Sequence, residues 1–414
     1  MRVLQLFNEY RSRFNGEEQV VRQIDRLLTE RGHDVETWVR SSQDIEDSLL
    51  GKARAFASMT WSAEASRAMA ERLREDRPDV VHAHNLYPLF SPSVLKACRK
   101  AGVPVVLSLH NQGLTCPKAD HLRDGKICEK CFGGKTWNCV RHNCRGSIVE
   151  SVGYAVRAGA AHHRGWFADN ATLVLGMTEF SRDRLVRAGY PAEKIRVLPN
   201  GVPLPAETTD PAAGAYVAFA GRLSEEKGLR SLIEAAKLAP EVPLRLAGDG
   251  PIADELRAAA PPNVTFLGRV AREDMPAFYA GSRALVLPST CFEMCPLTIL
   301  EAMGHGLPVV ASQTGGLGEL VADGRTGRLF PRGEAGPLAA ALREVWCDAA
   351  KASLWGEAGR RRAEAEFSED VFAGRLLSLY EEAVRGLRSD RRPERGATSA
   401  DARGPRPLAA VPAG

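Results

Sequence analysis

Short apolar runs typical of buried strands alternate with segments of helical period along most of this chain, and this alternation constrains the fold more than any other feature. It begins with an apolar run at residues 3–7, followed by an amphipathic helix predicted over 17–31. Similar pairs continue to about residue 367. Because strands that alternate with helices form parallel β-α-β units, the pattern predicts an α/β protein rather than separate groups of strands and helices.

A proline-rich segment divides the alternation into two halves. Residues 199–205 read Pro-Asn-Gly-Val-Pro-Leu-Pro, which is typical of a hinge between domains. We therefore predict a doubly wound, Rossmann-like domain over 1–200 and a second one over 201–367. A cleft between two such domains is the expected place for the chemistry. The length of 414 residues is compatible with this division.

Charge and apolar content exclude several classes of function. The net charge of +4, from 55 basic and 51 acidic residues, is too small to indicate nucleic-acid binding. No stretch approaches the roughly 20 apolar residues that a membrane-spanning helix needs. The chain does not start like a signal peptide, so we expect a cytoplasmic protein. Residues 389–414 are basic and are expected to form a disordered tail, which leaves peripheral contact with a membrane open.

Two cations lie in a loop that follows a strand pattern and precedes a helix in the second half. The segment from Ala220 to Gly228 reads Ala-Gly-Arg-Leu-Ser-Glu-Glu-Lys-Gly and contains Arg222 and Lys227. The free N–H groups at a helix start favour anions, and two neighbouring cations suit a diphosphate. The alternative is that both are solvated side chains of an ordinary loop.

Two carboxylates eight positions apart lie farther along the second half. Glu293 precedes a helix predicted over 297–305, and Glu301 lies about one turn inside it. Carboxylates accept hydrogen bonds from hydroxyl groups, and we expect the N–H groups of residues 294–297 to face the same space. A hydroxyl-rich ligand that carries phosphate matches this set of acceptors and donors. An ordinary helix with an acidic first turn is the alternative.

Together these motifs resemble those of the retaining GT-B glycosyltransferases of family 4. In that family a Gly-Arg-Leu-x-x-Glu-Lys-Gly segment is followed by Gly-x-Gly-Pro and then by two glutamates separated by seven residues. This chain has the same order, with Gly-Asp-Gly-Pro at 248–251 and Phe-Leu-Gly-Arg-Val at 266–270 between the other two motifs. The resemblance covers about residues 1–385. It implies the GT-B fold, with a last helix over 368–388 that crosses back to the first domain.

The resemblance also implies roles for matching residues of the second domain. Arg222 and Lys227 would bind the donor diphosphate. Glu293 would contact the hydroxyls of the transferred sugar, Glu301 the nucleotide ribose, and the backbone around Val270 the base. The implied donor site in this domain comprises Arg222, Lys227, Val270, Glu293, Met294, Cys295, Pro296, Leu297 and Glu301. Met294 and Cys295 stand where the family often has Gly and Phe or Val, which predicts a narrower pocket beside the sugar.

In the first domain the resemblance points to Gly16 and His110. Gly16 stands where the family has a Gly-Gly loop near the donor phosphate, although Asn15 replaces the other glycine. His110 follows a strand predicted over 103–109 and occupies the position of the family's active-site histidine. A packed histidine at a strand end is the alternative. The implied catalytic residues are His110, Arg222, Lys227 and Glu293.

The implied reaction transfers a hexose or N-acetylhexosamine from a nucleotide sugar to an acceptor hydroxyl with retention of configuration. UDP-N-acetylglucosamine and UDP-glucose are the donors expected from family frequency. The chain contains no Asp-x-Asp, so catalysis without a metal is expected. The expected acceptor is a small natural product such as an aminoglycoside, or a cell-surface glycan precursor. A noncatalytic sugar-nucleotide-binding regulator and a zinc-bearing nucleic-acid-binding protein are the alternatives.

A cysteine-rich insertion interrupts the first domain at residues 112–146. Five of the nine cysteines lie there, and disulfides are not expected in a protein that is not exported. The Cys-x2-Cys pair at 128 and 131 has the spacing of a structural zinc site. We predict a zinc ion held by Cys116, Cys128, Cys131 and Cys144, with Cys139, His121 or His142 as substitutes. Five reduced thiols and an iron–sulfur cluster are the alternatives.

Overall fold

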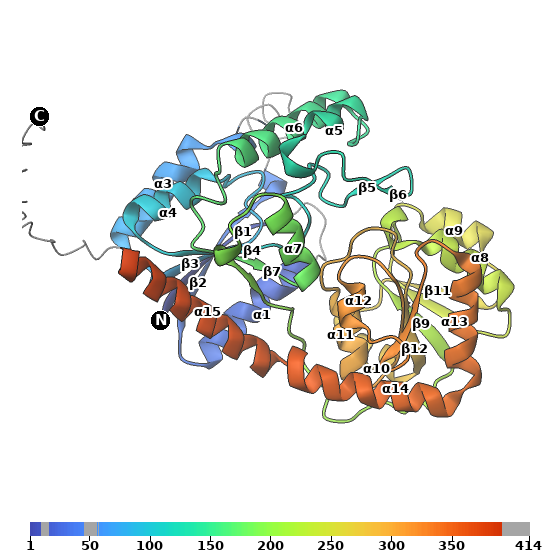
Figure 1. Cartoon of the computed structure of the whole chain (residues 1–414). Helices are drawn as coiled ribbons and strands as arrows, with labels where there is room; N and C mark the ends of the chain where they lie inside the picture. Colours follow the sequence, from blue (N-terminus) through green and yellow to red (C-terminus); the bar gives the residue numbers. More distant parts are fainter. Residues whose placement is uncertain (10–15, 45–55, 57, 391–414) are drawn as a thin grey trace, which may run out of the picture.

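The computed structural model describes residues 1–9, 16–44, 56 and 58–390. They form two α/β domains (Figure 1). Each domain contains one six-stranded sheet whose neighbouring strands pair in parallel. The alternating sequence pattern therefore predicted the fold class correctly.

The first sheet has the strand order β2-β1-β3-β4-β7-β8. Its strands are β1 (Arg2–Glu9), β2 (Asp34–Ser41), β3 (Val80–Ala83), β4 (Val105–Ser108), β7 (Leu173–Gly176) and β8 (Ile195–Val197). The helices packed on it are α1 (Gly16–Glu30), α3 (Ala63–Glu75), α4 (Ser93–Ala101), α7 (Glu179–Arg187) and α15 (Glu369–Asp390).

Successive residues of β1 face two separate hydrophobic cores. Leu4 and Leu6 pack with residues of α3 and α4. Val3 packs on the other face with residues of α1 and α15. Because neighbouring side chains of a strand point to opposite faces, an apolar run such as β1 requires helices on both sides of the sheet.

Local signals account for where these helices begin and end. The hydroxyl of Ser62 accepts a hydrogen bond from the Ala65 N–H and caps the start of α3. Gly102 ends α4 with a φ of 65°, a left-handed conformation that favours glycine. Helix α4 therefore ends a few residues before β4, and the predicted site residue His110 follows the carboxyl end of that strand.

The second sheet has the strand order β11-β10-β9-β12-β13-β14. Its strands are β9 (Tyr216–Ala220), β10 (Leu244–Ala247), β11 (Val264–Gly268), β12 (Ser282–Leu287), β13 (Val309–Ser312) and β14 (Gly327–Phe330). Its helices are α8 (Leu229–Leu238), α9 (Ala253–Ala259), α10 (Met275–Ala280), α11 (Leu297–Gly304), α12 (Leu317–Leu320), α13 (Ala335–Cys347) and α14 (Ala349–Arg362). The sequence pattern does not predict β14, because Gly-Arg-Leu-Phe is too short and too mixed to show a strand period.

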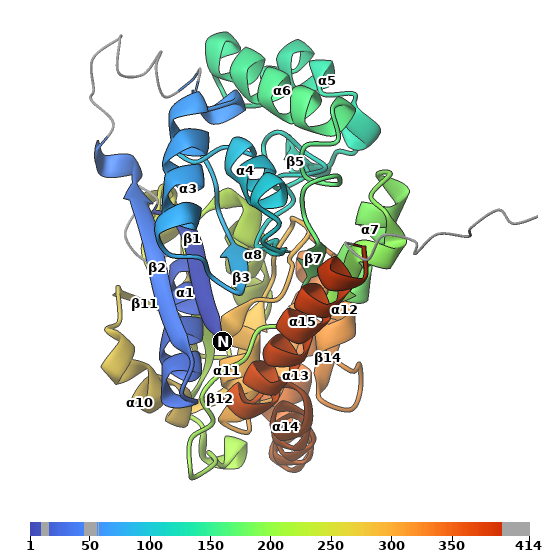
Figure 2. The same cartoon turned by 90° about the vertical axis from the view of Figure 1, so that its left-hand side faces the viewer.

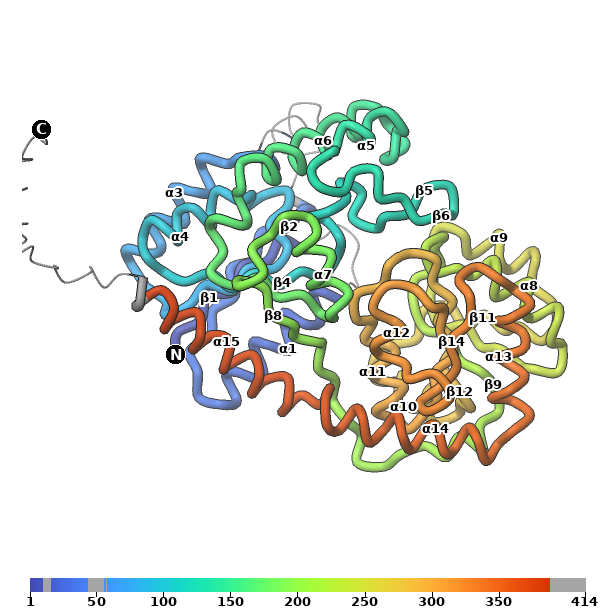
Figure 3. Tube along the Cα trace, in the orientation of Figure 1, coloured from blue at the N-terminus to red at the C-terminus, as the bar shows by residue number. Residues whose placement is uncertain are grey.

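The last helix connects the two domains, as predicted. The chain leaves the first domain after β8, builds the second domain and returns through α14 and α15 (Figure 3). Phe372, Leu376 and Tyr380 of α15 are buried against the first sheet and α1, and Figure 2 shows the helix lying along that domain. The helix ends at Asp390 rather than 388, and the rest of the predicted tail, 391–414, lies outside the described residues.

The cysteine-rich insertion forms a small substructure on the first domain. It contains an antiparallel hairpin of β5 (Leu122–Arg123) and β6 (Lys126–Ile127). Helix α5 (Trp137–Arg141) follows and packs against α6 (Ile148–His163). None of the helices in the described part of the chain has the length and apolar content needed to cross a membrane.

Candidate functional site

Lys227 and Glu293 form an ion pair at the carboxyl end of the second sheet. Lys227 ends the 3-10 helix η5 (Glu225–Lys227) after β9, and Glu293 lies in the loop between β12 and α11. The Lys227 Nζ atom is 2.6 Å from Glu293 Oε1, and the Ser289 hydroxyl donates to the same oxygen at 2.5 Å. Burial lowers the pKa of Lys227, but Glu293 together with Cys291 and Glu226 raises it overall. Lys227 is therefore held as a cation at neutral pH.

A glycine allows the two loops to approach each other. Gly228 has a φ of +68°, and a Cβ atom at this position would lie 1.9 Å from the Pro288 carbonyl oxygen. Only glycine combines this left-handed conformation with such a close approach. The Thr290 N–H also donates to the Glu226 carbonyl at 2.8 Å. These contacts place Lys227 opposite Glu293.

Arg222 is the second predicted cation of this loop, and its surroundings differ. Its side chain is exposed. Within the described part of the chain, its guanidinium forms neither a hydrogen bond nor an ion pair. The loop thus carries one cation held by a carboxylate and one that is accessible to a ligand.

Glu301 receives hydrogen bonds from both domains. It lies one turn inside α11, where the Tyr279 hydroxyl donates to Oε2 at 2.8 Å. The Gln19 amide of α1 reaches Oε1 at 3.5 Å. Burial and the Glu301 carboxylate raise the pKa of Tyr279 well above its ordinary value, so its hydroxyl keeps its proton. Glu301 is therefore an oriented acceptor near the interface between the domains.

The starts of α1 and α11 meet at this interface. Gly16 is the first residue of α1, and a Cβ atom added there would lie 3.6 Å from the Leu297 side chain. Pro296 precedes the first residue of α11 and has no N–H, so the prediction of N–H donors at all four residues 294–297 is wrong at this position. The remaining N–H groups belong to Met294 and Cys295, whose side chains are buried, and to Leu297.

The loop that carries Glu293 is tied to the first domain. The Gln112 amide donates to the Met294 sulfur at 2.8 Å, and the Asn200 amide donates to the Cys295 carbonyl at 2.8 Å. Val270, in the loop after β11, packs instead against the core of the second domain. The structure thus gathers most of the predicted donor residues beside the first domain.

His110 follows β4 and is one of three neighbouring histidines. Its Nε2 atom lies 3.0 Å from Nδ1 of His84. His82 is hydrogen-bonded to the Tyr380 hydroxyl at 2.7 Å and to the Ser108 hydroxyl at 2.8 Å. Burial lowers the pKa of both His82 and His110 to about 3, with a further contribution from His110 in the case of His82. With so low a pKa, His110 is neutral and only weakly basic, which suits positioning of a ligand better than proton abstraction.

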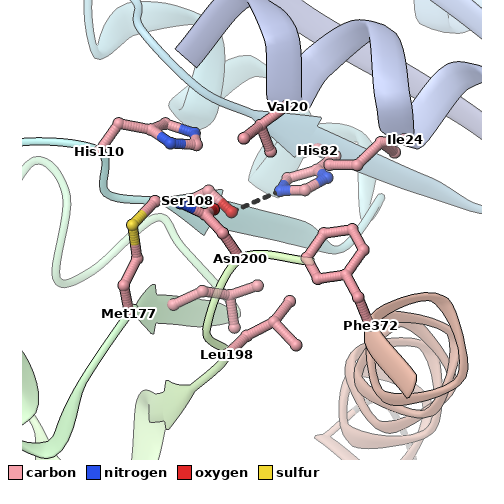
Figure 4. Close-up of a pocket in the computed structure, with 10 residues that line it drawn as sticks. Val20, Ile24, His82, Ser108, His110, Met177, Leu198, Asn200 and Phe372 are labelled. Carbon is pink, nitrogen blue, oxygen red and sulfur yellow. Dashed lines mark hydrogen bonds between the residues drawn. The ribbon is translucent and has the colours of Figure 1, made fainter. Parts of the chain in front are cut away.

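A small cavity lies beside His110 (Figure 4). Its lining includes His82, Ser108, Asn200 and Phe372. Its volume of about 10 Å³ is enough for about one water molecule and far too small for a sugar. The cavity, which His110 and Phe372 of α15 both line, is therefore not a substrate pocket.

The cysteines of the insertion gather in one region. Cys131 and Cys139 form a buried cluster with Ala155 of α6, and Cys144 packs against it. Burial, followed by neighbouring cysteines including Cys116, raises the pKa of the Cys131 thiol to about 12. Among the described residues, no group of three or more His, Cys, Asp or Glu side chains is arranged to hold a metal ion. The thiols predicted as zinc ligands are thus neighbours without a preformed coordination shell.

Arg184 of α7 links the insertion to the loop that carries Glu293, a contact that the sequence does not predict. Its guanidinium lies over the Phe292 ring, 4.6 Å from the centroid, and donates to His121 Nε2 at 3.0 Å. It also pairs with Glu129 of the insertion. The residues around Arg184 in the sequence do not indicate these partners. The sequence around Tyr279 likewise does not indicate its hydrogen bond to Glu301.

Comparisons with known proteins cover both domains. The model described as Glycosyltransferase Family 4 matches residues 14–205, and the model described as Glycosyl transferases group 1 matches residues 214–348. Glycogen synthase of Mycobacterium tuberculosis is 28% identical over 374 residues, which cover 84% of this chain and 81% of that protein. Sulfoquinovosyl transferase SQD2 of Arabidopsis thaliana is 33% identical over 364 residues, which cover 82% of this chain and 65% of that protein.

Solved structures share the fold. Anabaena Alr3699/HepE in complex with UDP has a TM-score of 0.64 at 22% identity, with 92% of this chain and 100% of that chain covered. Sucrose-phosphate synthase from Thermosynechococcus elongatus has a TM-score of 0.69 at 19% identity, with 93% and 99% covered. Because the family models match both domains and these structures share their arrangement, the chain is a GT-B glycosyltransferase that belongs to family 4.

Proposed function

We propose that this enzyme transfers a hexose or N-acetylhexosamine from a UDP-sugar to an acceptor hydroxyl with retention of configuration. The observation that carries the proposal is the Lys227–Glu293 ion pair ahead of α11, with Glu301 one turn inside that helix. Cations for a diphosphate and carboxylates for hydroxyl groups are the partners that a nucleotide sugar needs. HepE was solved with UDP and with UDP-glucose, which supports UDP-glucose as the donor here, with UDP-N-acetylglucosamine as the second candidate.

The proposed reaction requires no metal. The acceptor oxygen bonds to the anomeric carbon while the bond from that carbon to the diphosphate oxygen breaks. The departing oxygen takes the proton of the acceptor hydroxyl, so the products are a glycoside and UDP. Arg222 and Lys227 would stabilise the charge that develops on the diphosphate. Glu293 would orient the hydroxyls of the sugar, and a neutral His110 would position it.

A donor screen tests this proposal. The full chain is incubated with UDP-glucose, UDP-N-acetylglucosamine and GDP-mannose, with and without EDTA, in the presence of acceptor mixtures. We expect UDP release from a UDP-sugar at a rate that EDTA does not change, and an α-linked product by NMR from the α-linked donor. An inverted product, or release only from GDP-mannose, would contradict the proposal. Nucleotide binding without turnover would favour a noncatalytic regulator, and salt-dependent DNA or RNA binding without UDP binding would favour a nucleic-acid-binding protein.

Glu301→Gln is expected to weaken UDP binding by about tenfold or more, because a carboxylate that accepts from ribose hydroxyls makes charge-assisted hydrogen bonds. Calorimetry with UDP and 2′-deoxy-UDP measures this effect. The difference in affinity between the two ligands should be smaller in the variant than in the wild type. Glu255→Gln, on the exposed face of α9, is the control. Equal losses of affinity in both variants would refute the role of Glu301.

For the acceptor we propose the hydroxyl of a cell-surface glycan precursor, with a small natural product such as an aminoglycoside as the second candidate. The support is an exposed apolar surface on α5 and α6, formed by Trp137, Ile148, Val149, Val152 and Val156. Such a stripe, with basic residues nearby, suits peripheral contact with a membrane that holds a lipid-linked precursor. Acceptor activity in membrane extracts but not with soluble aminoglycosides would support this choice.

We also propose a structural zinc ion in the insertion, bound by Cys116, Cys128, Cys131 and Cys144. The support is the ligand spacing and the nearness of the other three cysteines to Cys131, since all three help to raise the pKa of its thiol. We expect elemental analysis to find about one zinc per chain and a strong chelator to lower the Tm by about 5 °C or more. Cys131→Ser should lose the metal, whereas Cys347→Ser, an exposed cysteine of α13, should keep it. Absence of zinc together with unchanged melting would rule the site out.

A further inference from the structure

A chain of hydrogen bonds joins Gln5, His84 and His110 across three neighbouring strands. Gln5 lies in β1, His84 follows β3 and His110 follows β4. Gln5 Oε1 is 3.1 Å from His84 Nε2, and His84 Nδ1 is 3.0 Å from His110 Nε2. Gln5 and His84 are 0% and 4% exposed, so water does not compete for these bonds.

A backbone carbonyl determines which atoms donate and which accept in this series of hydrogen bonds. The Gln5 side-chain nitrogen lies 3.2 Å from the Val21 carbonyl oxygen and 3.1 Å from the Thr37 hydroxyl. A carbonyl can only accept, so the amide NH2 of Gln5 must face Val21. The amide oxygen then faces His84 Nε2, which must carry a hydrogen to donate.

The position of the hydrogen on His84 determines the position of the hydrogen on His110. A neutral imidazole carries one hydrogen, so His84 with a hydrogen on Nε2 has a lone pair on Nδ1. His110 Nε2 must then donate to that lone pair. Burial, together with His82 and His110, lowers the pKa of His84 well below its ordinary value, which keeps it neutral.

The remaining nitrogen of His110, Nδ1, is left as an acceptor. Its imidazole is neutral and uses its one hydrogen toward His84, so Nδ1 has a lone pair. No residue in the described part of the chain is hydrogen-bonded to Nδ1, and the side chain is partly exposed. We propose that Gln5 and His84 are positioning residues that hold His110 as the Nε2–H tautomer, so that Nδ1 accepts a hydrogen bond from a hydroxyl group of the transferred sugar.

This inference rests on the proposed function and adds a rule of specificity to it. A sugar hydroxyl can donate to a lone pair, whereas a carboxylate or phosphate oxygen cannot. A donor with a hydroxyl facing His110 should therefore be preferred to one with a carboxylate or a hydrogen there. The amide of Gln5, two residues away along the chain of bonds, sets this preference without touching the substrate.

NMR of the full chain with 15N-labelled histidine tests the tautomer directly. The signals of His110 are assigned by their loss in His110→Gln. We expect a protonated Nε2 and an unprotonated Nδ1 in the wild type, and a mixture of tautomers in His84→Leu. Tyr380→Phe is the matched control. It removes a hydrogen bond from the adjacent buried His82 but leaves the bonds among Gln5, His84 and His110 in place. A wild-type His110 with its hydrogen on Nδ1, or with both nitrogens protonated, would overturn the inference.

Kinetics with UDP-glucose and its monodeoxy analogues test the consequence. In the wild type, removal of the hydroxyl that faces His110 should lower kcat/KM by about tenfold, and this difference should shrink in His84→Leu. His84→Asn, whose amide oxygen can accept from Nε2, should restore part of it. UDP affinity should stay unchanged in all these variants. Lack of turnover with every UDP-sugar would count against the proposed function alone, since the NMR result does not depend on activity. If the loss of kcat/KM with the deoxy analogue were as large in His84→Leu as in the wild type, the positioning role would be refuted.

Discussion

Lys227→Met is expected to lower kcat/KM by about 100- to 1000-fold with the preferred donor. In the proposed reaction the variant loses a cation that would stabilise the leaving diphosphate, in a loop where Lys227 is 23% and Glu293 12% exposed. It also leaves the Glu293 carboxylate without its partner, which adds charge repulsion against the diphosphate. Steady-state kinetics measure the loss of kcat/KM, and UDP calorimetry measures the loss of nucleotide affinity.

A double variant separates chemistry from stability. An unpaired, mostly buried carboxylate destabilises a protein, so Lys227→Met alone should also lower the Tm. Lys227→Met with Glu293→Gln removes both charges and should recover most of the Tm while activity stays low. Lys237→Met, which breaks an exposed pair with Glu234 on α8, should change neither. Recovery of activity in the double variant would show that Lys227 only balances Glu293.

Leu376→Asp in the crossover helix is expected to unfold the first domain or to lower its Tm by about 10 °C or more. Leu376 is fully buried, in a core shared with Val3, Val20 and Leu173. A carboxylate there would have no cation among its neighbours in this cluster, and the hydroxyl of the one tyrosine, Tyr380, is already hydrogen-bonded elsewhere. Burial of an unpaired charge costs several kcal/mol. Circular dichroism melting curves of the full chain measure the effect.

Ser378→Asp tests whether burial is the cause. Ser378 lies two residues farther along α15 and is exposed, so the same charge should change the Tm by less than about 2 °C. Destabilisation of similar size in both variants would mean that charge on α15, rather than burial of Leu376, governs stability. Because Tyr380 of the same helix is bonded to His82, partial unfolding of α15 should also disturb the histidines beside the site.

Most helices and strands could be predicted because each carries its period within its own segment. The apolar run of β1 and the helical spacing of α1 are examples. Strand β14 and the β5–β6 hairpin escape prediction because two to four residues carry no period. These elements are defined by the strand beside them, which is a property of the folded chain.

The same distinction between local patterns and tertiary contacts applies to the residues of the candidate site. Lys227, Glu293 and Glu301 lie in motifs with fixed spacing, so the sequence alone indicates them. Tyr279 and Gln19, which donate to Glu301, show no such spacing, because one lies on α10 and the other on the opposite domain. Their contact with Glu301 exists only once the helices have packed.

By itself the sequence determined an α/β chain in two halves, a proline-rich segment between them, a last amphipathic helix and the motifs of family 4, since all of these are local patterns of residue type. Only the tertiary structure decided that Lys227 pairs with Glu293, that Arg184 joins the insertion to the neighbouring Phe292, and that His84 lies within hydrogen-bond distance of both Gln5 and His110. The physical reason is that a charge or a proton is held by whatever lies within about 3 Å of it. For these groups the partners come from distant parts of the chain, and the packing of parallel strands brings them together.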